Sequence, residues 1–204
     1  MITIIDYGIG NLRSIEKAFA HVGAMVLRTD RPEDIAAADH LVLPGVGAFG
    51  ACIGEVRKRA LAGPILESVQ RGVPFLGICI GMQMLFEAGL EGGEHKGLGI
   101  LPGHVRRLAF PNGVRLKVPQ IGWNQVLAQH PSPLLAGTGP APWCYFVHSY
   151  HAAPVHAGDI IATTTYGIEF PSVVGRDNIY GVQFHPEKSQ RSGLRILKNF
   201  AGLS

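Results

Sequence analysis

Cysteine, charge and long apolar runs are all scarce in this chain. Cysteine occurs only three times in 204 residues, an odd number that makes no disulfide framework and fits a reducing compartment. No apolar run approaches the ~20 residues that a membrane-spanning helix needs, and the first one, residues 2–5, is too short for a secretory signal. We therefore expect a cytoplasmic protein that does not enter a membrane.

Charged residues make up 16% of the chain, and the net charge is +3. Basic residues form short clusters at 57–59 and 106–107 instead of a stripe with interleaved aromatic side chains. Such clusters are typical of solvated surface, so we expect no nucleic-acid partner. We also expect neither a metal ion nor a cofactor.

Hydrophobic residues are abundant, at 47%, and 27 glycines and 14 prolines indicate many turns. In the first 100 residues short apolar runs alternate with segments of helical spacing, which predicts a parallel sheet with helices on both faces. After residue 100 the pattern predicts short strands, among them 103–108, 114–118 and 121–126, and a hairpin over 159–174. We therefore expect one α/β domain, residues 1–204, whose mostly parallel central sheet is flanked by helices and extended by antiparallel hairpins.

The most informative stretch is residues 73–83. An apolar run ends in GICIG at 77–81, and an amphipathic segment follows, which we expect to be a helix that ends near residues 88–89. This pattern is the thiol form of the nucleophile elbow, with Cys79 on a sharp strand-to-helix turn. A helix N-terminus favours the thiolate, and the N–H of Ile80 can hold an oxyanion. The alternative is a buried structural cysteine.

A partner for this cysteine lies at the end of the expected strand 178–184. There His185 and Glu187 are two residues apart, so an extended backbone puts them on one side. An imidazole can shuttle the proton of a thiol, and a carboxylate can fix the tautomer of the imidazole. The alternative is a strand-end histidine capped by an acid. His148 is a rival base, but its apolar strand favours a core histidine.

A third motif is the glycine-rich loop PGVG at residues 44–47, directly after the expected strand 41–43. Its glycines permit backbone conformations that aim N–H groups at an anion. Carboxyl ends of parallel strands share one rim, so Val46 and Gly47 are candidates for an oxyanion loop facing Cys79. The alternative is an ordinary βα turn.

These three motifs together resemble the class I glutamine amidotransferases, and the resemblance spans nearly the whole chain. Further runs, at residues 4–12, 122–124, 145–150 and 185–189, are similar to the glutaminase subunits of imidazole glycerol phosphate synthases. Other branches of the family usually carry histidine where Met82 stands. Two departures are visible: PQI at residues 119–121 replaces a common Pro-His-Met, and Ile80 replaces a usual leucine.

The resemblance implies that the chain hydrolyses L-glutamine to glutamate and ammonia through a Cys79-His185-Glu187 triad. It assigns the oxyanion to N–H groups of Ile80 and of the Val46–Gly47 loop. The glutamine-binding positions that it implies are Gln83, Glu91 and the backbone near Ser149.

The resemblance also implies a heterodimer with the cyclase subunit of imidazole glycerol phosphate synthase, which uses the ammonia to form imidazole glycerol phosphate and AICAR in histidine biosynthesis. Positions that face this partner or the ammonia exit are Asn11, Trp123, Tyr145 and Lys188. For Trp123 the alternative is a core aromatic, and for Lys188 a solvated charge. Three other functions stay open: a subunit of another synthase such as anthranilate synthase, a non-catalytic scaffold, and a different cysteine hydrolase.

Overall fold

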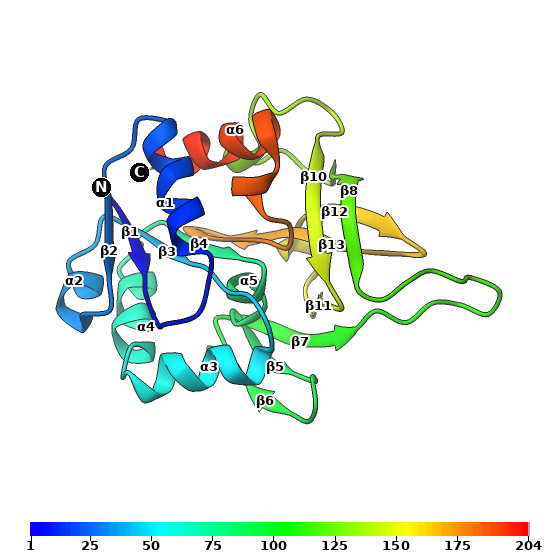
Figure 1. Ribbon diagram of the computed structural model, residues 1–204, viewed down its shortest axis with the longest axis horizontal. Coiled ribbons are helices and arrows are strands. Elements are labelled where there is room, and N and C mark those ends of the chain that lie inside the picture. The colour runs from blue at the N-terminus through cyan, green and yellow to red at the C-terminus, as the bar shows by residue number, and fades with distance from the viewer. Residues whose placement is uncertain (204) are drawn as a thin grey trace.

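A large mixed sheet forms the centre of the computed structural model, which describes residues 1–203 (Figure 1). Parallel pairing joins its first five strands, and antiparallel pairing adds the last three. In spatial order the strands are β2 (Val26–Thr29), β1 (Ile2–Ile5), β3 (His40–Leu43), β4 (Phe75–Ile78), β14 (Ile179–Val182), β13 (Ile168–Arg176), β12 (Ile160–Tyr166) and β9 (Leu127–Ala128). This is the expected α/β architecture, with the β12–β13 hairpin as predicted.

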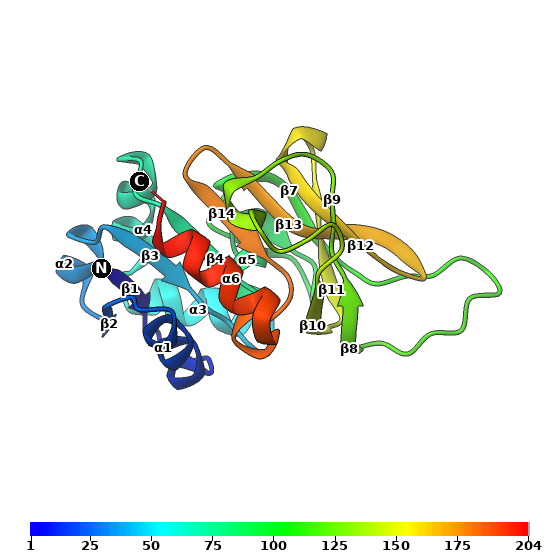
Figure 2. The same cartoon turned by 90° about the horizontal axis from the view of Figure 1, so that it is seen from above.

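Helices cover both faces of the parallel half, since β1, β4 and β14 are buried along their whole length. The helices are α1 (Leu12–His21), α2 (Pro32–Ala36), α3 (Phe49–Lys58), α4 (Ala62–Gln70), α5 (Ile80–Gln83) and α6 (Gln190–Ala201). Figures 1 and 2 show α1 and α6 on one face of the sheet and α3 and α4 on the other. Among the described residues, no helix combines the length and apolar character needed to cross a membrane.

Two small sheets lie beside the central one. Strand β10 (Trp143–His148) pairs with β8 (Gln120–Gln125), and a four-stranded sheet joins β11 (Tyr150–Pro154), β7 (Leu101–Arg107), β5 (Phe86–Gly89) and β6 (His95–Lys96). The described part of the chain also contains three 3-10 turns: η1 (Pro133–Leu135), η2 (Ala157–Asp159) and η3 (Pro186–Lys188). Most of the middle strands therefore form sheets of their own and do not extend the central sheet.

The expectation of a helix from the elbow to residues 88–89 is wrong. Helix α5 ends at Gln83, and the chain continues as strand β5. Phe86 and Ala88 are buried while Glu87 between them is exposed, which is the alternation of a strand. The amphipathic pattern therefore belongs to an inner strand of the four-stranded sheet, between β7 and β6.

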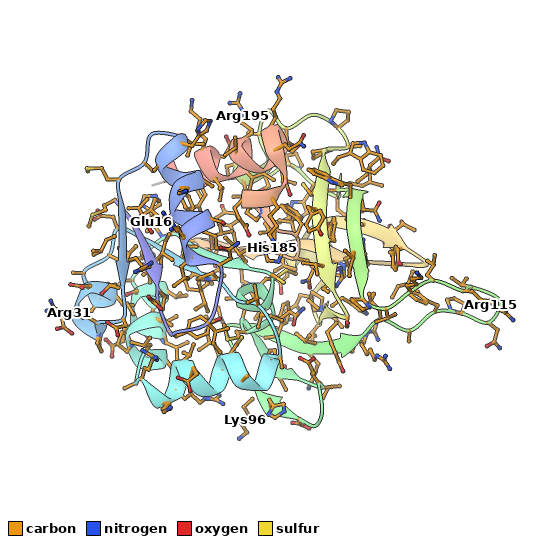
Figure 3. The ribbon with its side chains drawn as sticks, in the orientation of Figure 1. Glu16, Arg31, Lys96, Arg115, His185 and Arg195 are labelled. Atoms are coloured by element: carbon orange, nitrogen blue, oxygen red, sulfur yellow. The ribbon has the colours of Figure 1, made fainter. Side chains whose placement is uncertain are left out.

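The strand expected at residues 114–118 is also wrong. These residues lie in an arm between β7 and β8 that projects from the body, with Arg115 near its tip (Figure 3). Val114 and Leu116 are exposed there, and the Tyr166 hydroxyl donates to the carbonyl of Lys117 at 2.9 Å. β-Branched composition alone does not make a strand where no neighbouring strand pairs with it.

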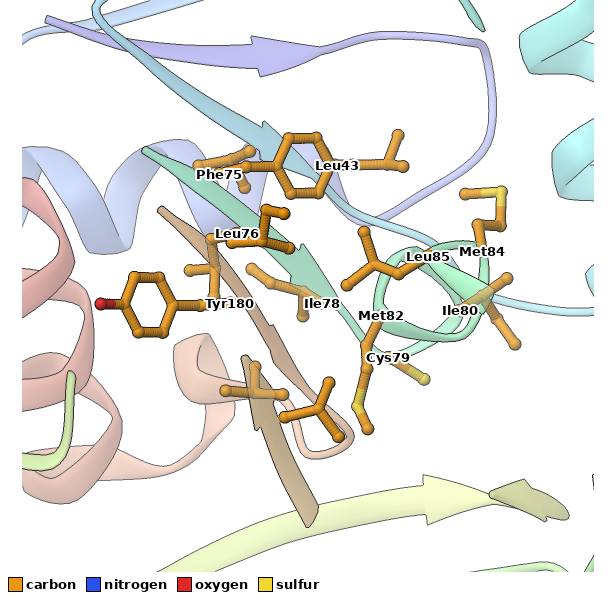
Figure 4. Packing of buried hydrophobic residues seen from close by; sticks show 14 of the residues in the cluster. Leu43, Phe75, Leu76, Ile78, Cys79, Ile80, Met82, Met84, Leu85 and Tyr180 are labelled. Carbon is orange, nitrogen blue, oxygen red and sulfur yellow. The ribbon is translucent and has the colours of Figure 1, made fainter. Parts of the chain in front are cut away.

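Close backbone contact fixes the position of the elbow. The apolar side chains of β4 and of the segment after Cys79 pack together in the core (Figure 4). A Cβ on Gly81 would overlap the carbonyl oxygen of Leu43, and one on Gly45 would lie 2.9 Å from the backbone nitrogen of Gly81. Glycine at these positions thus lets the end of β3 and the start of α5 touch.

We predict that Gly81→Ala destabilises the fold by about 1–3 kcal/mol, because the methyl group must push α5 away from β3. The matched control is Gly54→Ala in α3, where a Cβ meets nothing within 4 Å. That change should stabilise the fold by about 0.5–1 kcal/mol through lower backbone entropy. Denaturant unfolding measures both, and an unchanged midpoint for Gly81→Ala would contradict the close contact.

Candidate active site

Cys79 occupies a strained backbone conformation at the carboxyl end of β4. Its φ is 55° and its ψ is −109°, between the last residue of β4 and the first of α5. Its N–H donates to the carbonyl of Val182 at 2.8 Å, so β14 helps to hold the turn. Non-glycine residues reach such conformations at a cost of about 1–3 kcal/mol, and they concentrate at functional sites. The expected sharp strand-to-helix turn at Cys79 is therefore present.

Helix α5 is much shorter than the sequence pattern predicts. Four residues supply free N–H groups but only a small aligned dipole. The stabilisation of a Cys79 thiolate therefore has to come mainly from neighbouring side chains.

His185 and Glu187 form a buried pair beside this turn. Nδ1 of His185 lies 2.8 Å from Oε1 of Glu187, and the two side chains are 3% and 0% exposed. His185 is extended, as expected, but Glu187 returns to it through the 3-10 turn η3 and not along an extended backbone. Among residues 1–203, Nε2 of His185 has no hydrogen-bond partner. This nitrogen therefore stays available for a reacting group.

The pKa of His185 reflects two opposing effects. Burial alone lowers it, but attraction to the Cys79 and Glu187 side chains outweighs burial and raises the pKa from 6.5 to about 10. The ring is therefore protonated at neutral pH, and a positive charge lies beside the Cys79 sulfur. Such a charge is the usual way in which a thiolate is stabilised.

Cys79 and His185 open into a common cavity of about 250 Å³. The predicted site residues that line it are Val46, Gly47, Cys79, Ile80, Gln83, Glu91, Ser149 and His185. Four lining residues were not predicted: Pro119, Val147, His148 and Tyr150. Glu187 lies behind His185 and outside this lining. The structure therefore brings together every predicted catalytic, oxyanion and substrate-binding position.

The glycine-rich loop is held by two buried donors. The Tyr7 hydroxyl donates to the carbonyl of Pro44 at 2.7 Å, and the Cys52 thiol donates to the carbonyl of Val46 at 3.2 Å. Gly47 has a φ of 86°, which glycine adopts readily. The N–H and C=O of a trans peptide point in opposite directions, so the N–H of Gly47 points away from Cys52.

Gln83 and Glu91 are each fixed by one end of the side chain. Nε2 of Gln83 donates to the carbonyl of Tyr150 at 3.0 Å, while its Oε1 is buried without a partner among the described residues. Oε2 of Glu91 accepts from the N–H of Phe49 at the start of α3, at 2.8 Å. Both residues line the cavity, and Oε1 of Gln83 is left as an unpaired acceptor.

The predicted partner-facing residues lie mostly on one surface. Trp123 and Tyr145 are register partners across β8 and β10, and their rings meet edge to face with centroids 6.0 Å apart. Nζ of Lys188 lies 5.8 Å from the centre of the Tyr145 ring. Asn11 precedes α1, which contacts the η3 turn that carries Lys188. Trp123 is 43% exposed, so its alternative assignment to the core is wrong.

Comparison with known proteins bears directly on this arrangement. The family glutamine amidotransferase class-I matches residues 3–202. The chain is 60% identical over 208 residues to the imidazole glycerol phosphate synthase subunit HisH of Salinibacter ruber, covering 100% of this chain and 94% of that protein. The corresponding subunit of Syntrophotalea carbinolica is 50% identical over 208 residues, with all of both chains covered.

The chain belongs to the class I glutamine amidotransferases. Solved structures agree on the fold of this amidotransferase. A crystal structure of glutamine amidotransferase superposes with a TM-score of 0.77 at 20% identity, covering 99% of each chain. A chain of PurLQS from Thermotoga maritima gives a TM-score of 0.72 at 18% identity, covering 98% of this chain and 96% of that one. At these identities the likeness concerns the fold alone.

One polar residue beside the amidotransferase sulfur escaped sequence analysis. Gln183, on the chain between β14 and His185, is fully buried and lies 3.8 Å from Sγ of Cys79 through its Nε2. A lone glutamine inside an otherwise apolar strand was the signal that could have found it, because buried amides need partners.

The backbone strain gives the first prediction for this site. Glycine accepts a positive φ without cost, so Cys79→Gly should be more stable than Cys79→Ala by about 1–2 kcal/mol. Cys144, buried in β10, is the matched position because its φ is not positive. There the alanine variant should be the more stable one. Thermal unfolding measures the stability of the four variants. If the alanine variant were the more stable one at both positions, the backbone strain at Cys79 would be contradicted.

The raised pKa of His185 gives the second prediction. The protonated ring stabilises the folded state below pH 6.5, and this contribution is lost as the pH rises towards about 10. The stability lost in His185→Gln should therefore be largest near pH 6 and shrink towards pH 10. Unfolding free energies at several pH values measure it, with the exposed His156→Gln as control. A loss that grows with pH would contradict the assignment.

Proposed function

We propose that this amidotransferase, as a single domain of residues 1–204, hydrolyses L-glutamine to glutamate and ammonia. Cys79 is the nucleophile, His185 the general acid and base, and Glu187 the group that orients His185. The observation that carries the proposal is the buried contact of 2.8 Å between Nδ1 of His185 and Glu187. It leaves the other ring nitrogen for the cavity that Cys79 shares.

The proposed reaction has two halves. In the first, Sγ of Cys79 attacks the side-chain carboxamide carbon of glutamine, and N–H groups of Ile80 and Gly47 hold the resulting oxyanion. The protonated His185 gives its proton to the departing nitrogen, so ammonia leaves and a glutamyl thioester remains. In the second, neutral His185 takes a proton from water, the water oxygen attacks the thioester, and glutamate and the cysteine thiolate are formed.

Substrate recognition is proposed to rest on the acceptors at the cavity. The α-ammonium group of glutamine carries three N–H donors, which suit the unpaired Oε1 of Gln83 and the carboxylate of Glu91. Backbone near Ser149 supplies the third wall of the pocket. A bound ammonium group would satisfy the buried oxygen of Gln83, which otherwise costs about 1–3 kcal/mol.

We further infer a heterodimer with the cyclase subunit of imidazole glycerol phosphate synthase. Support comes from the full-length relatives, which are named as subunits of that synthase. The exposed aromatic pair Trp123 and Tyr145, with Lys188 and Asn11 nearby, is the proposed contact surface, because aromatic anchors dominate interface energetics. Ammonia that is released into an interface shielded from solvent avoids protonation to ammonium, which is not a nucleophile. The cyclase subunit would use this ammonia to form imidazole glycerol phosphate and AICAR in histidine biosynthesis.

A cytoplasmic location follows from this proposal. All three cysteines are free, and a reducing compartment keeps them so. A thiol nucleophile needs the same condition.

The direct test measures glutamate release from glutamine with and without the cyclase subunit and its ribonucleotide ligand. We expect the complex to release glutamate and Cys79→Ala to lose release by at least about 10³-fold while still binding the partner. Lys188→Ala should weaken binding or activation and leave folding intact. Glutamate release that survives in Cys79→Ala would contradict the proposed mechanism.

A further inference from the structure

Gln183 is a buried polar residue, and both the nitrogen and the oxygen of its side-chain amide form hydrogen bonds. Its side chain is fully buried between apolar neighbours, two residues before His185. Nε2 donates to Sγ of Cys79 at 3.8 Å, and Oε1 accepts from Nε2 of Gln83 at 3.1 Å. An amide in such surroundings is costly unless it is paired, so its partners determine its orientation.

The backbone carbonyl of Tyr150 determines the orientation of the side-chain amides of Gln83 and Gln183. The oxygen of Tyr150 can only accept, so the Gln83 atom 3.0 Å from it must be the amide nitrogen. The same Gln83 nitrogen also faces the end of the Gln183 side chain. If Gln183 turned its NH₂ group towards it, two N–H donors would face each other without an acceptor. The oxygen of Gln183 must therefore face Gln83, and its NH₂ group must face the sulfur of Cys79.

His148 holds the same carbonyl from the other side. Its Nδ1 lies 2.8 Å from the Tyr150 oxygen, and burial lowers the pKa of His148 to about 4. Because the Tyr150 oxygen can only accept, Nδ1 of His148 is the donor in this contact, while Nε2 lies 3.1 Å from Oε1 of Gln120. The two lone pairs of the carbonyl thus bind His148 and Gln83 together, and strand β10 contributes to the fixed orientation of Gln183.

We propose that Gln183 is a further catalytic residue, whose amide N–H stabilises the thiolate of Cys79 before attack on glutamine. Gln83 is its positioning residue through the carbonyl of Tyr150. This inference rests on the proposed glutaminase function. It also accounts for how a four-residue helix can support a thiolate, because the amide replaces part of the missing dipole. Hydrogen bonds to ionised acceptors are about twice as strong as neutral ones, so the contact favours the thiolate over the thiol.

The test follows the alkylation of Cys79 by iodoacetamide as a function of pH, with the label located on Cys79 by peptide mass spectrometry. Gln183→Met has nearly the same volume but no N–H donor. We expect it to slow alkylation about tenfold near pH 6 and to move the half-maximal rate up by about one pH unit. At high pH, where every accessible thiol is ionised, its rate should equal that of the unaltered protein.

Two further variants make the result decisive. Gln183→Glu keeps the shape and replaces the NH₂ group by an oxygen, so its shift to higher pH should be larger than that of Gln183→Met. Ser172→Ala is the matched control, because Ser172 is buried, its hydroxyl has no hydrogen-bond partner among the described residues, and its backbone carbonyl, which accepts from the N–H of Gln183, is kept in alanine. Its profile should equal that of the unaltered protein.

Two results would overturn the inference. One is an alkylation profile of both Gln183 variants that superposes on that of the unaltered protein. The other is an equal fall at every pH, including the high-pH plateau, which would mean that Gln183 affects only packing or access. Alkylation requires neither glutamine nor a partner, so a normal shift without any glutamate release would contradict the glutaminase proposal alone.

Discussion

The backbone of Cys79 is the constraint on which the rest of the site depends. Strand β4 is paired on both sides and ends in a sharp turn at Cys79, and the absence of a Cβ on Gly81 lets that turn pack against β3. The sulfur is thereby placed at the rim where β14 delivers His185. Packing in the centre of the sheet thus determines the backbone geometry of Cys79.

Buried polar groups around that sulfur act together. His185 is charged because Cys79 and Glu187 outweigh its burial, and Glu187 is out of reach of solvent behind it. The amides of Gln83 and Gln183 extend the network to a backbone carbonyl on β11. Low polarity inside the protein strengthens each of these contacts and makes the loss of any one costly.

Features that depend on local sequence patterns were predicted correctly, whereas features that depend on tertiary packing were not. The Gly-X-Cys-X-Gly turn, the His-Pro-Glu run and the parallel strands follow from short-range chemistry. The residues after Gln83 were misassigned because a short apolar run is ambiguous between helix and strand. Helix α6 was not foreseen, although Gly193, Ile196, Leu197 and Phe200 follow helical spacing. No role was predicted for Gln183, because a glutamine in an apolar run indicates a buried amide with partners but does not identify those partners.

We propose that the Cys79 sulfur and the His185 ring act on one substrate in one cavity. The most direct measurement is a crystal structure of the protein after reaction with an electrophilic glutamine analogue. We expect a covalent bond to Sγ of Cys79, with Nε2 of His185 within about 3.2 Å of the sulfur or of the leaving-group position. A label on Cys52 or Cys144, or a His185 ring turned away from the adduct, would contradict it.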